Sequence, residues 1–135
     1  MYKYAIKHLN KAERFIRAGE YDYDGKFYDA AIGHAYYAMY HAARALLLLL
    51  ERSPKTHSGV INSLWENKNK LKLDDEDVKN LSRVFSRRIE CDYGVDLEPK
   101  SKDLTKETIE LSKSFVEKSK KIVEGWGTGE ENHSD

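Results

Sequence analysis

Residues 30–50, AAIGHAYYAMYHAARALLLLL, predict one long helix with two dissimilar sides. At about 100° of rotation per residue, one side is an ordinary core stripe. Its members are Ile32, Ala35, Tyr36, Met39, Ala43, Leu46, Leu47 and Leu50. The apolar run that ends the segment is interrupted by Arg44 and is much shorter than the roughly 20 residues that span a bilayer. The pattern therefore predicts a buried helix and no membrane anchor.

The opposite side of this helix carries polar and cationic groups among small and apolar residues. The polar set is His34, Tyr37, His41 and Arg44, with Ala38, Ala45 and Leu48 beside it. Buried polar groups need partners, so we expect this side to meet another surface or a ligand. The alternative is a half-exposed helix with its histidines at the rim, and the pattern favours neither.

Composition limits the class of protein. The 135 residues fit one domain, and 23 Lys and Arg balance 23 Asp and Glu, so a contact with RNA would have to come from a local patch. Cys91 is the single cysteine, which excludes an internal disulfide and a zinc site made of thiolates. The N-terminal residues do not resemble a cleavable signal, and together these features favour the cytoplasm.

Pro54 and Pro99 divide the chain into three blocks, and the first block predicts two antiparallel helices. Apolar residues recur at helical spacing from Tyr2 to Ile16, and Gly19 is the expected terminator. A turn over residues 22–25 then leads into the long helix.

Two polar residues predict helix starts between the prolines. Thr56 is expected to cap a short helix that runs to about Trp65. Asp74 is expected to cap a longer helix that fades near Gly94, with carboxylates in its first turn, where they suit the positive helix end. The apolar stripe of this longer helix is Val78, Leu81, Val84, Phe85 and Ile89.

The block after Pro99 predicts a last helix and a tail. Apolar residues recur from Leu104 to Trp126, and the Lys–Glu alternation beside them is typical of a solvated face. Residues 127–135 lack periodic apolar positions and are expected to be disordered. The predicted fold is all-α: an up-and-down antiparallel bundle of four main helices plus one short helix, over residues 1–126.

The fourth predicted helix places neighbouring arginines on different sides. Arg88 and Asp92 fall in its apolar sector, whereas Arg83 and Arg87 are expected to point toward solvent. The spacing of Arg88 and Asp92 predicts an ion pair, which lessens the cost of holding a guanidinium against apolar surface. This pair has two interpretations. In the structural one, it stabilises the end of the helix or a contact between two copies of the chain. In the functional one, the planar guanidinium of Arg88 binds a phosphate, with the Tyr93 hydroxyl nearby.

The histidines are the other candidates for chemistry. His57 lies near a predicted helix N-terminus, where an anion could be held, although such a histidine is also a common structural residue. His34 and His41 lie about two turns or 10 Å apart, too far to share a metal ion without a third element. They could line an RNA groove with Tyr37 and Arg44, or have a structural or dimer-facing role. We expect no metal site and no cofactor, because no phosphate-binding glycine loop or paired-cysteine motif is present.

Three ordered segments resemble the HEPN superfamily, and more narrowly its small stand-alone prokaryotic members of the UPF0332-like family. They are YYAMYHAARALL (36–47), KTHSGVI (55–61) and SRRIECDYG (86–94), and the similarity spans roughly residues 4–123. The resemblance implies a helical bundle that forms a homodimer. It also implies the toxin of a toxin–antitoxin pair, a metal-independent endoribonuclease that a minimal nucleotidyltransferase holds in check.

The family motif is an arginine followed, after four to six residues, by a histidine, and the resemblance assigns the arginine to Arg88, with Arg87 second. From either arginine the permitted positions fall within residues 92–95, DYGV, and none is histidine. Tyrosine, with a pKa of about 10, replaces histidine poorly as a general base, which leaves ribonuclease activity open.

Helical phase and the resemblance together give two sets of candidate site residues. The catalytic candidates are Arg88, Asp92 and Tyr93, and the RNA- or nucleotide-binding candidates are Arg87, His34, Tyr37, His41, Arg44 and His57. The alternative function is a non-catalytic helical partner that binds a nucleotide or substrate for a minimal nucleotidyltransferase.

Overall fold

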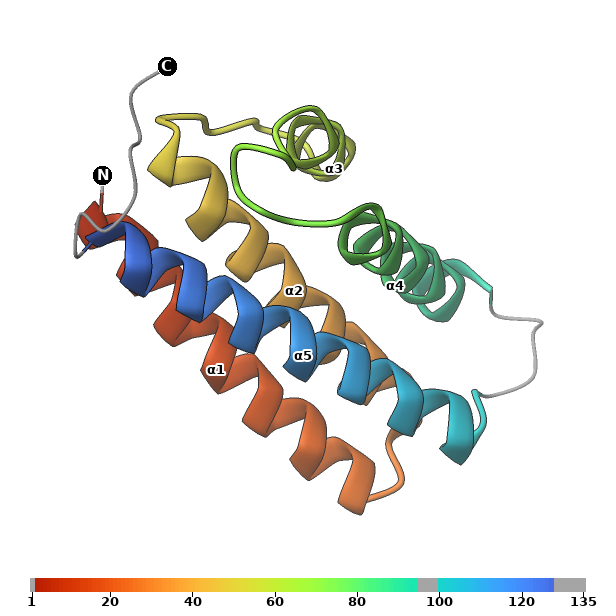
Figure 1. Ribbon diagram of the computed structural model, residues 1–135. Coiled ribbons are helices and arrows are strands. Elements are labelled where there is room, and N and C mark those ends of the chain that lie inside the picture. The colour runs from red at the N-terminus through yellow and green to blue at the C-terminus, as the bar shows by residue number, and fades with distance from the viewer. Residues whose placement is uncertain (1, 95–99, 128–135) are drawn as a thin grey trace.

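The computed structural model describes residues 2–94 and 100–127. Its helices are α1 (Tyr2–Asp24), α2 (Tyr28–Leu49), α3 (His57–Glu66), α4 (Asp75–Tyr93) and α5 (Lys102–Gly127), and the described residues contain no strand. The helices α1, α2 and α5 lie side by side, and α3 and α4 pack against α2 on the side away from α1 (Figure 1). The predicted all-α bundle of four long helices and one short helix is confirmed.

The central helix is α2, which touches every other helix. Its buried residues are Ala31, Ile32, Ala35, Tyr36, Ala38, Met39, Ala42, Ala43, Ala45, Leu46, Leu47 and Leu48. Small side chains let α1 and α5 approach closely, and the Ser112 hydroxyl of α5 donates a hydrogen bond to the Ala35 carbonyl at 2.8 Å. The sequence pattern of alanines with large apolar residues thus makes α2 the core of the bundle.

The prediction that Gly19 ends the first helix is wrong, because α1 continues to Asp24. Gly19 is buried against α2, and a Cβ at this position would lie 3.4 Å from the Ala31 carbonyl oxygen. The turn follows Asp24 and includes Lys26 in a left-handed conformation with φ of 65°. The lack of a side chain at Gly19 therefore allows α1 and α2 to approach closely, and it does not end α1.

Both predicted helix caps are confirmed. The Thr56 hydroxyl accepts a hydrogen bond from the Gly59 amide at 2.9 Å and starts α3. Asp74 and Asp77 form a reciprocal capping box at the start of α4, with both hydrogen bonds 2.9 Å long. These local signals fix where α3 and α4 begin, and therefore which of their residues face α2.

The last predicted helix is present, but its buried face differs from the predicted stripe: Phe115, Val116 and Val123 are buried with Thr105, Thr108, Ser112 and Ser119, while Leu104, Leu111, Ile122 and Trp126 are half-buried. Part of its charged face pairs with α1. Lys113 lies 3.0 Å from Glu20, and Lys120 lies 3.8 Å from Glu13. Gly127, which was assigned to the tail, is the last residue of α5, and the remaining tail residues 128–135 lie outside the described residues. Within the described ranges, no helix combines the length and apolarity that crossing a membrane requires.

Candidate functional site

Arg88 lies on the side of α4 that faces α2, and two side chains hold its guanidinium. Its Nε lies 2.9 Å from an Asp92 carboxylate oxygen, and its Nη2 donates to the Tyr37 hydroxyl at 2.8 Å. The predicted ion pair is therefore present. The guanidinium carbon also lies 5.1 Å from the centre of the Tyr37 ring, within the range of a cation–π contact. These contacts orient the guanidinium, while 19% of the Arg88 side chain stays exposed.

His57 lies next to this arginine through the ring of Tyr36. The Tyr36 ring centre is 5.6 Å from the His57 ring and 5.8 Å from the Arg88 guanidinium carbon. The Tyr36 hydroxyl is 2.5 Å from His57 Nδ1. The His57 ring also stacks on Tyr40 of α2 and on Phe85 of α4, with ring centres 4.5 and 5.7 Å apart. One histidine thus joins α2, α3 and α4 at the site.

Burial and nearby cations set the protonation of this pair. Burial lowers the pKa of His57 below its ordinary value, and the positive charges of Arg88 and Arg44 lower it further. Burial raises the pKa of Tyr36 above its ordinary value. Near neutral pH the imidazole is therefore uncharged and the phenol keeps its proton. We call Tyr36, Tyr37, His57, Arg88 and Asp92 the Arg88 cluster.

Arg44 positions His57 without touching Arg88. Its guanidinium donates to the Tyr40 hydroxyl at 3.0 Å, the Pro54 carbonyl at 3.1 Å and the Ser53 hydroxyl at 3.0 Å. Residues 53–56 connect α2 to the cap of α3, so these bonds fix the entry into the helix that begins at His57. The predicted polar side of α2 thus contributes Arg44 and Tyr37 to the site.

His34 and His41 lie elsewhere, toward α1. His34 Nδ1 is 2.5 Å from an Asp22 carboxylate oxygen, and His41 Nδ1 is 3.0 Å from His8 Nδ1. The Phe15 ring stacks on both imidazoles. Each histidine thus has a hydrogen-bond partner on α1, and both line a hollow that Tyr37 also lines. Their assignment as RNA contacts stays a prediction.

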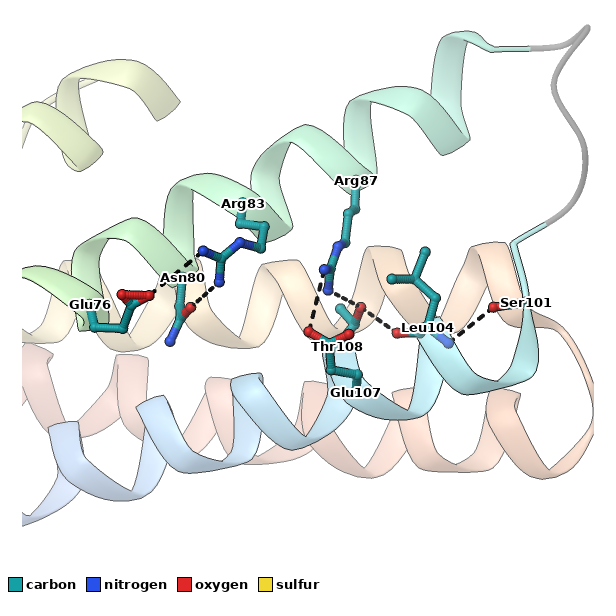
Figure 2. A network of polar contacts seen from close by, with 8 residues as sticks. All are labelled: Glu76, Asn80, Arg83, Arg87, Ser101, Leu104, Glu107 and Thr108. Atoms are coloured by element: carbon teal, nitrogen blue, oxygen red, sulfur yellow. Dashed lines mark hydrogen bonds and ion pairs between the residues drawn. The ribbon is translucent and has the colours of Figure 1, made fainter.

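The prediction that Arg87 points toward solvent is wrong. Figure 2 shows Arg87 reaching from α4 to α5, where it donates to the Thr108 hydroxyl at 2.8 Å and approaches a Glu107 oxygen at 3.4 Å. Only 15% of its side chain is exposed, because α5 packs along this side of α4. Arg83, one turn earlier, is 46% exposed and contacts residues of its own helix, as predicted.

Tyr93, the last catalytic candidate, is 75% exposed at the C-terminal end of α4. Gly94 follows as the helix cap, and Val95 lies outside the described residues. The motif position therefore presents a phenol to solvent, and a catalytic role for it stays a prediction.

Tyr36 is the site residue that the sequence pattern does not reveal. Its position on the core stripe predicts packing alone, and the residue is indeed fully buried. A buried tyrosine needs a partner for its hydroxyl, and this requirement is the signal that points to His57. Among the described residues, no buried side-chain nitrogen or oxygen lacks a hydrogen-bond partner.

A family model of the HEPN domain matches residues 5–123. The chain belongs to the HEPN domain family. A "UPF0332 protein" of Archaeoglobus fulgidus is 43% identical over 96 residues, which cover 71% of this chain and 76% of the relative. A protein of Methanocaldococcus jannaschii named "Putative toxin" is 35% identical over 98 residues, which cover 72% and 67% of the two chains. This HEPN domain therefore has similar proteins in archaea, and the predicted resemblance is confirmed.

Proposed function

We propose that this HEPN-domain protein is an RNA-directed toxin that acts as a homodimer, with Arg88 of each copy binding an RNA phosphate. Membership of the family supports the proposal, as does the name given to the Methanocaldococcus jannaschii relative. The observation that carries it is Arg88, whose guanidinium Asp92 and Tyr37 hold in place while 19% of the side chain remains exposed. Such a fork suits a phosphate oxygen pair.

In this proposal His57 takes the role that the motif histidine has elsewhere in the family. The proposal assigns the imidazole proton to Nδ1, from which it is donated to the Tyr36 hydroxyl 2.5 Å away. Nε2 then carries the lone pair that accepts the proton of an RNA 2′-hydroxyl. The 2′-oxygen then bonds to phosphorus, the bond to the 5′-oxygen breaks, and the leaving oxygen takes a proton from water. The resulting hydroxide takes the proton from His57, which returns the imidazole to its neutral form. The lowered pKa of His57 keeps it unprotonated and ready at neutral pH.

The remaining candidates have supporting roles in the proposal. Asp92 balances and orients the guanidinium, and the exposed Tyr93 offers a further hydroxyl or a stacking surface to RNA at the end of α4. A minimal nucleotidyltransferase serves as the antitoxin and binds this toxin in the cytoplasm.

The test is expression of the chain without a partner. We expect the wild type to slow growth and cleave cellular RNA, and Arg88→Ala to do neither. Arg83→Ala is the matched control, because it removes an exposed arginine from the same helix and should behave as the wild type. Circular dichroism of each purified variant shows whether the fold is kept. If the wild type leaves growth and RNA untouched, the toxin proposal is wrong.

The second candidate is a non-catalytic partner of a nucleotidyltransferase. It is favoured by the contacts that Asp92 and Tyr37 already make with Arg88 and by the tyrosine at the motif position. In that case the chain copurifies with a transferase encoded nearby and binds nucleotide in calorimetry without turning over RNA. Lack of both association and nucleotide binding would exclude this alternative.

A further inference from the structure

A second surface, on α1, gathers cations along a shallow groove of about 730 Å³. Lys7, Lys11, Arg14 and Arg17 line it from α1, and His8 and His41 lie where α1 meets α2. We call this surface the α1 groove. All four cationic residues are exposed. The chain has no net charge, so this local excess of positive charge is offset by negative charge elsewhere in the chain. It does not arise from a basic composition of the whole chain.

Few carboxylates lie at the α1 groove, although Arg17 at its end also lines a neighbouring hollow with Glu117 and Glu124. Within residues 2–94 and 100–127, no carboxylate lies within ion-pair distance of Lys7, Lys11, Arg14 or Arg17. The only acidic side chain that lines the groove, Glu13, pairs instead with Lys120 of α5 at 3.8 Å. Like charges three or four residues apart on a helix repel each other and destabilise it. An anion in the groove would remove this repulsion.

The two histidines make the groove responsive to an anion. His8 Nδ1 and His41 Nδ1 are 3.0 Å apart, so one imidazole donates and the other accepts. Burial lowers the pKa of His41 to about 4, and the neighbouring His8, Lys11 and Arg44 add to this effect. A phosphate bound nearby would oppose these charges and raise the pKa.

The α1 groove is connected to the Arg88 cluster by a second hollow, of about 430 Å³. This hollow shares Lys11 and His41 with the α1 groove, and Tyr37 also lines it. The Tyr37 hydroxyl accepts the hydrogen bond from Arg88. The lining residues therefore run from Tyr37, the hydrogen-bond partner of Arg88, to Lys11 of the α1 groove.

We propose that the α1 groove binds the phosphodiester backbone of single-stranded RNA that extends from the Arg88 cluster, with Lys7, Lys11, Arg14 and Arg17 as phosphate contacts. The cations cover about 15 Å along the helix axis, enough for several phosphates of one strand. Tyr4, 54% exposed and also lining the groove, provides a ring for a base to stack on. The identity of the polyanion as RNA rests on the proposed function, whereas the anion site rests on the groove alone.

The test is fluorescence anisotropy with a labelled single-stranded RNA whose 2′-hydroxyls are methylated, so that it cannot be cleaved. Lys11→Gln combined with Arg14→Gln should weaken binding by at least about tenfold and reduce the slope of log K against log salt by about 1.4, since each phosphate contact contributes about 0.7. The control combines Lys79→Gln with Lys102→Gln, exposed lysines on α4 and α5. It should stay within about twofold of the wild type.

Arg88→Ala separates this inference from the proposed function. It should lose RNA cleavage but keep most of its affinity for the methylated RNA, because the groove is intact. If the wild type cleaves no RNA but the groove variant still loses binding, the toxin proposal fails and the groove inference stands. Equal affinity of the wild type and the groove variant would overturn the groove inference, as would binding of polyglutamate in preference to RNA.

Nuclear magnetic resonance locates the bound strand. Addition of the methylated RNA should raise the pKa of His41 in the wild-type protein, because phosphates enter the groove beside it. An unchanged pKa at saturating RNA would place the strand elsewhere and overturn the inference.

Discussion

The two sides of α2 pack by different means. Toward α1 and α5, Ala31 and Ala35 are almost fully buried, and their small size brings the backbones of the three helices together. Toward α3 and α4, Tyr36 and Tyr37 pack through large rings whose hydroxyls each have a specific partner. Packing on the first side depends on the small size of its side chains, and packing on the second side depends on specific hydrogen-bonded pairs. This difference explains how one helix both forms a core and holds a charged site near the surface.

The largest effect is expected on the alanine side. Ala35→Leu should destabilise the domain by about 1–3 kcal/mol, because the added atoms have no space between α2 and its neighbours. The measurement is the free energy of unfolding in urea. Ala30→Leu is the control, since Ala30 is exposed on the same helix, and it should change stability by less than about 0.5 kcal/mol. Equal losses of unfolding free energy in the two variants would show that the packing around Ala35 accommodates a larger side chain.

On the aromatic side, loss of one partner should cost less. Tyr36→Phe keeps the ring but leaves His57 Nδ1 without its hydroxyl, for an expected loss of about 1 kcal/mol. Tyr21→Phe, at a residue that is 81% exposed, is the control and should be neutral. An unchanged midpoint for Tyr36→Phe in urea unfolding would mean that the Tyr36–His57 contact does not stabilise the fold.

An effect of pH on stability is expected at the junction of α1 and α2. The pKa of His41 is about 4 when folded and 6.5 ordinarily, so the unfolded chain takes up the proton first as the pH falls. The stability that the neutral His41 contributes is complete above pH 6.5 and is lost between pH 6.5 and about pH 4. His41→Gln should flatten the dependence of unfolding free energy on pH in this window. A wild-type profile that rises as the pH falls would contradict this sign.

The finest comparison is between two adjacent arginines. Arg88→Ala should raise the pKa of His57 toward its ordinary value, because the charge of Arg88 lowers it. Arg87→Ala should leave that pKa unchanged, because Arg87 contacts α5. Histidine resonances followed through a pH titration measure both. The same pKa in the Arg88 variant and the wild type would mean that the two residues do not share a site.

Local signals predicted most of the fold. The caps at Thr56 and Asp74 and the apolar periods placed all five helices, because these features act within a few residues. Gly19 was misread because a glycine that ends a helix and one that allows close packing look alike without the neighbouring helix. Arg87 was misread for a related reason, since only the docking of α5 decides that its side of α4 is covered.

The candidate site was predicted in part. The phase of α4 identified Arg88 and its ion pair with Asp92, since both lie on one helix. The meeting of His57 with Tyr36 depends on how α3 returns to α2, and helical phase within one segment cannot show this. The α1 groove was not predicted, because its four cations have the pattern of an ordinary solvent-exposed helix face. Only the described structure shows that they lack acidic partners.

In the proposed function Arg88, and not its neighbour Arg87, acts on RNA. The most direct measurement is the rate at which the purified protein cleaves single-stranded RNA, compared among the wild type, Arg88→Ala and Arg87→Ala. We predict that Arg88→Ala lowers the rate at least about 100-fold, as loss of an oriented charge on a reacting phosphate should, while Arg87→Ala stays within a few fold of the wild type. An Arg88→Ala variant as active as the wild type, or a wild type that leaves RNA intact, would contradict the account.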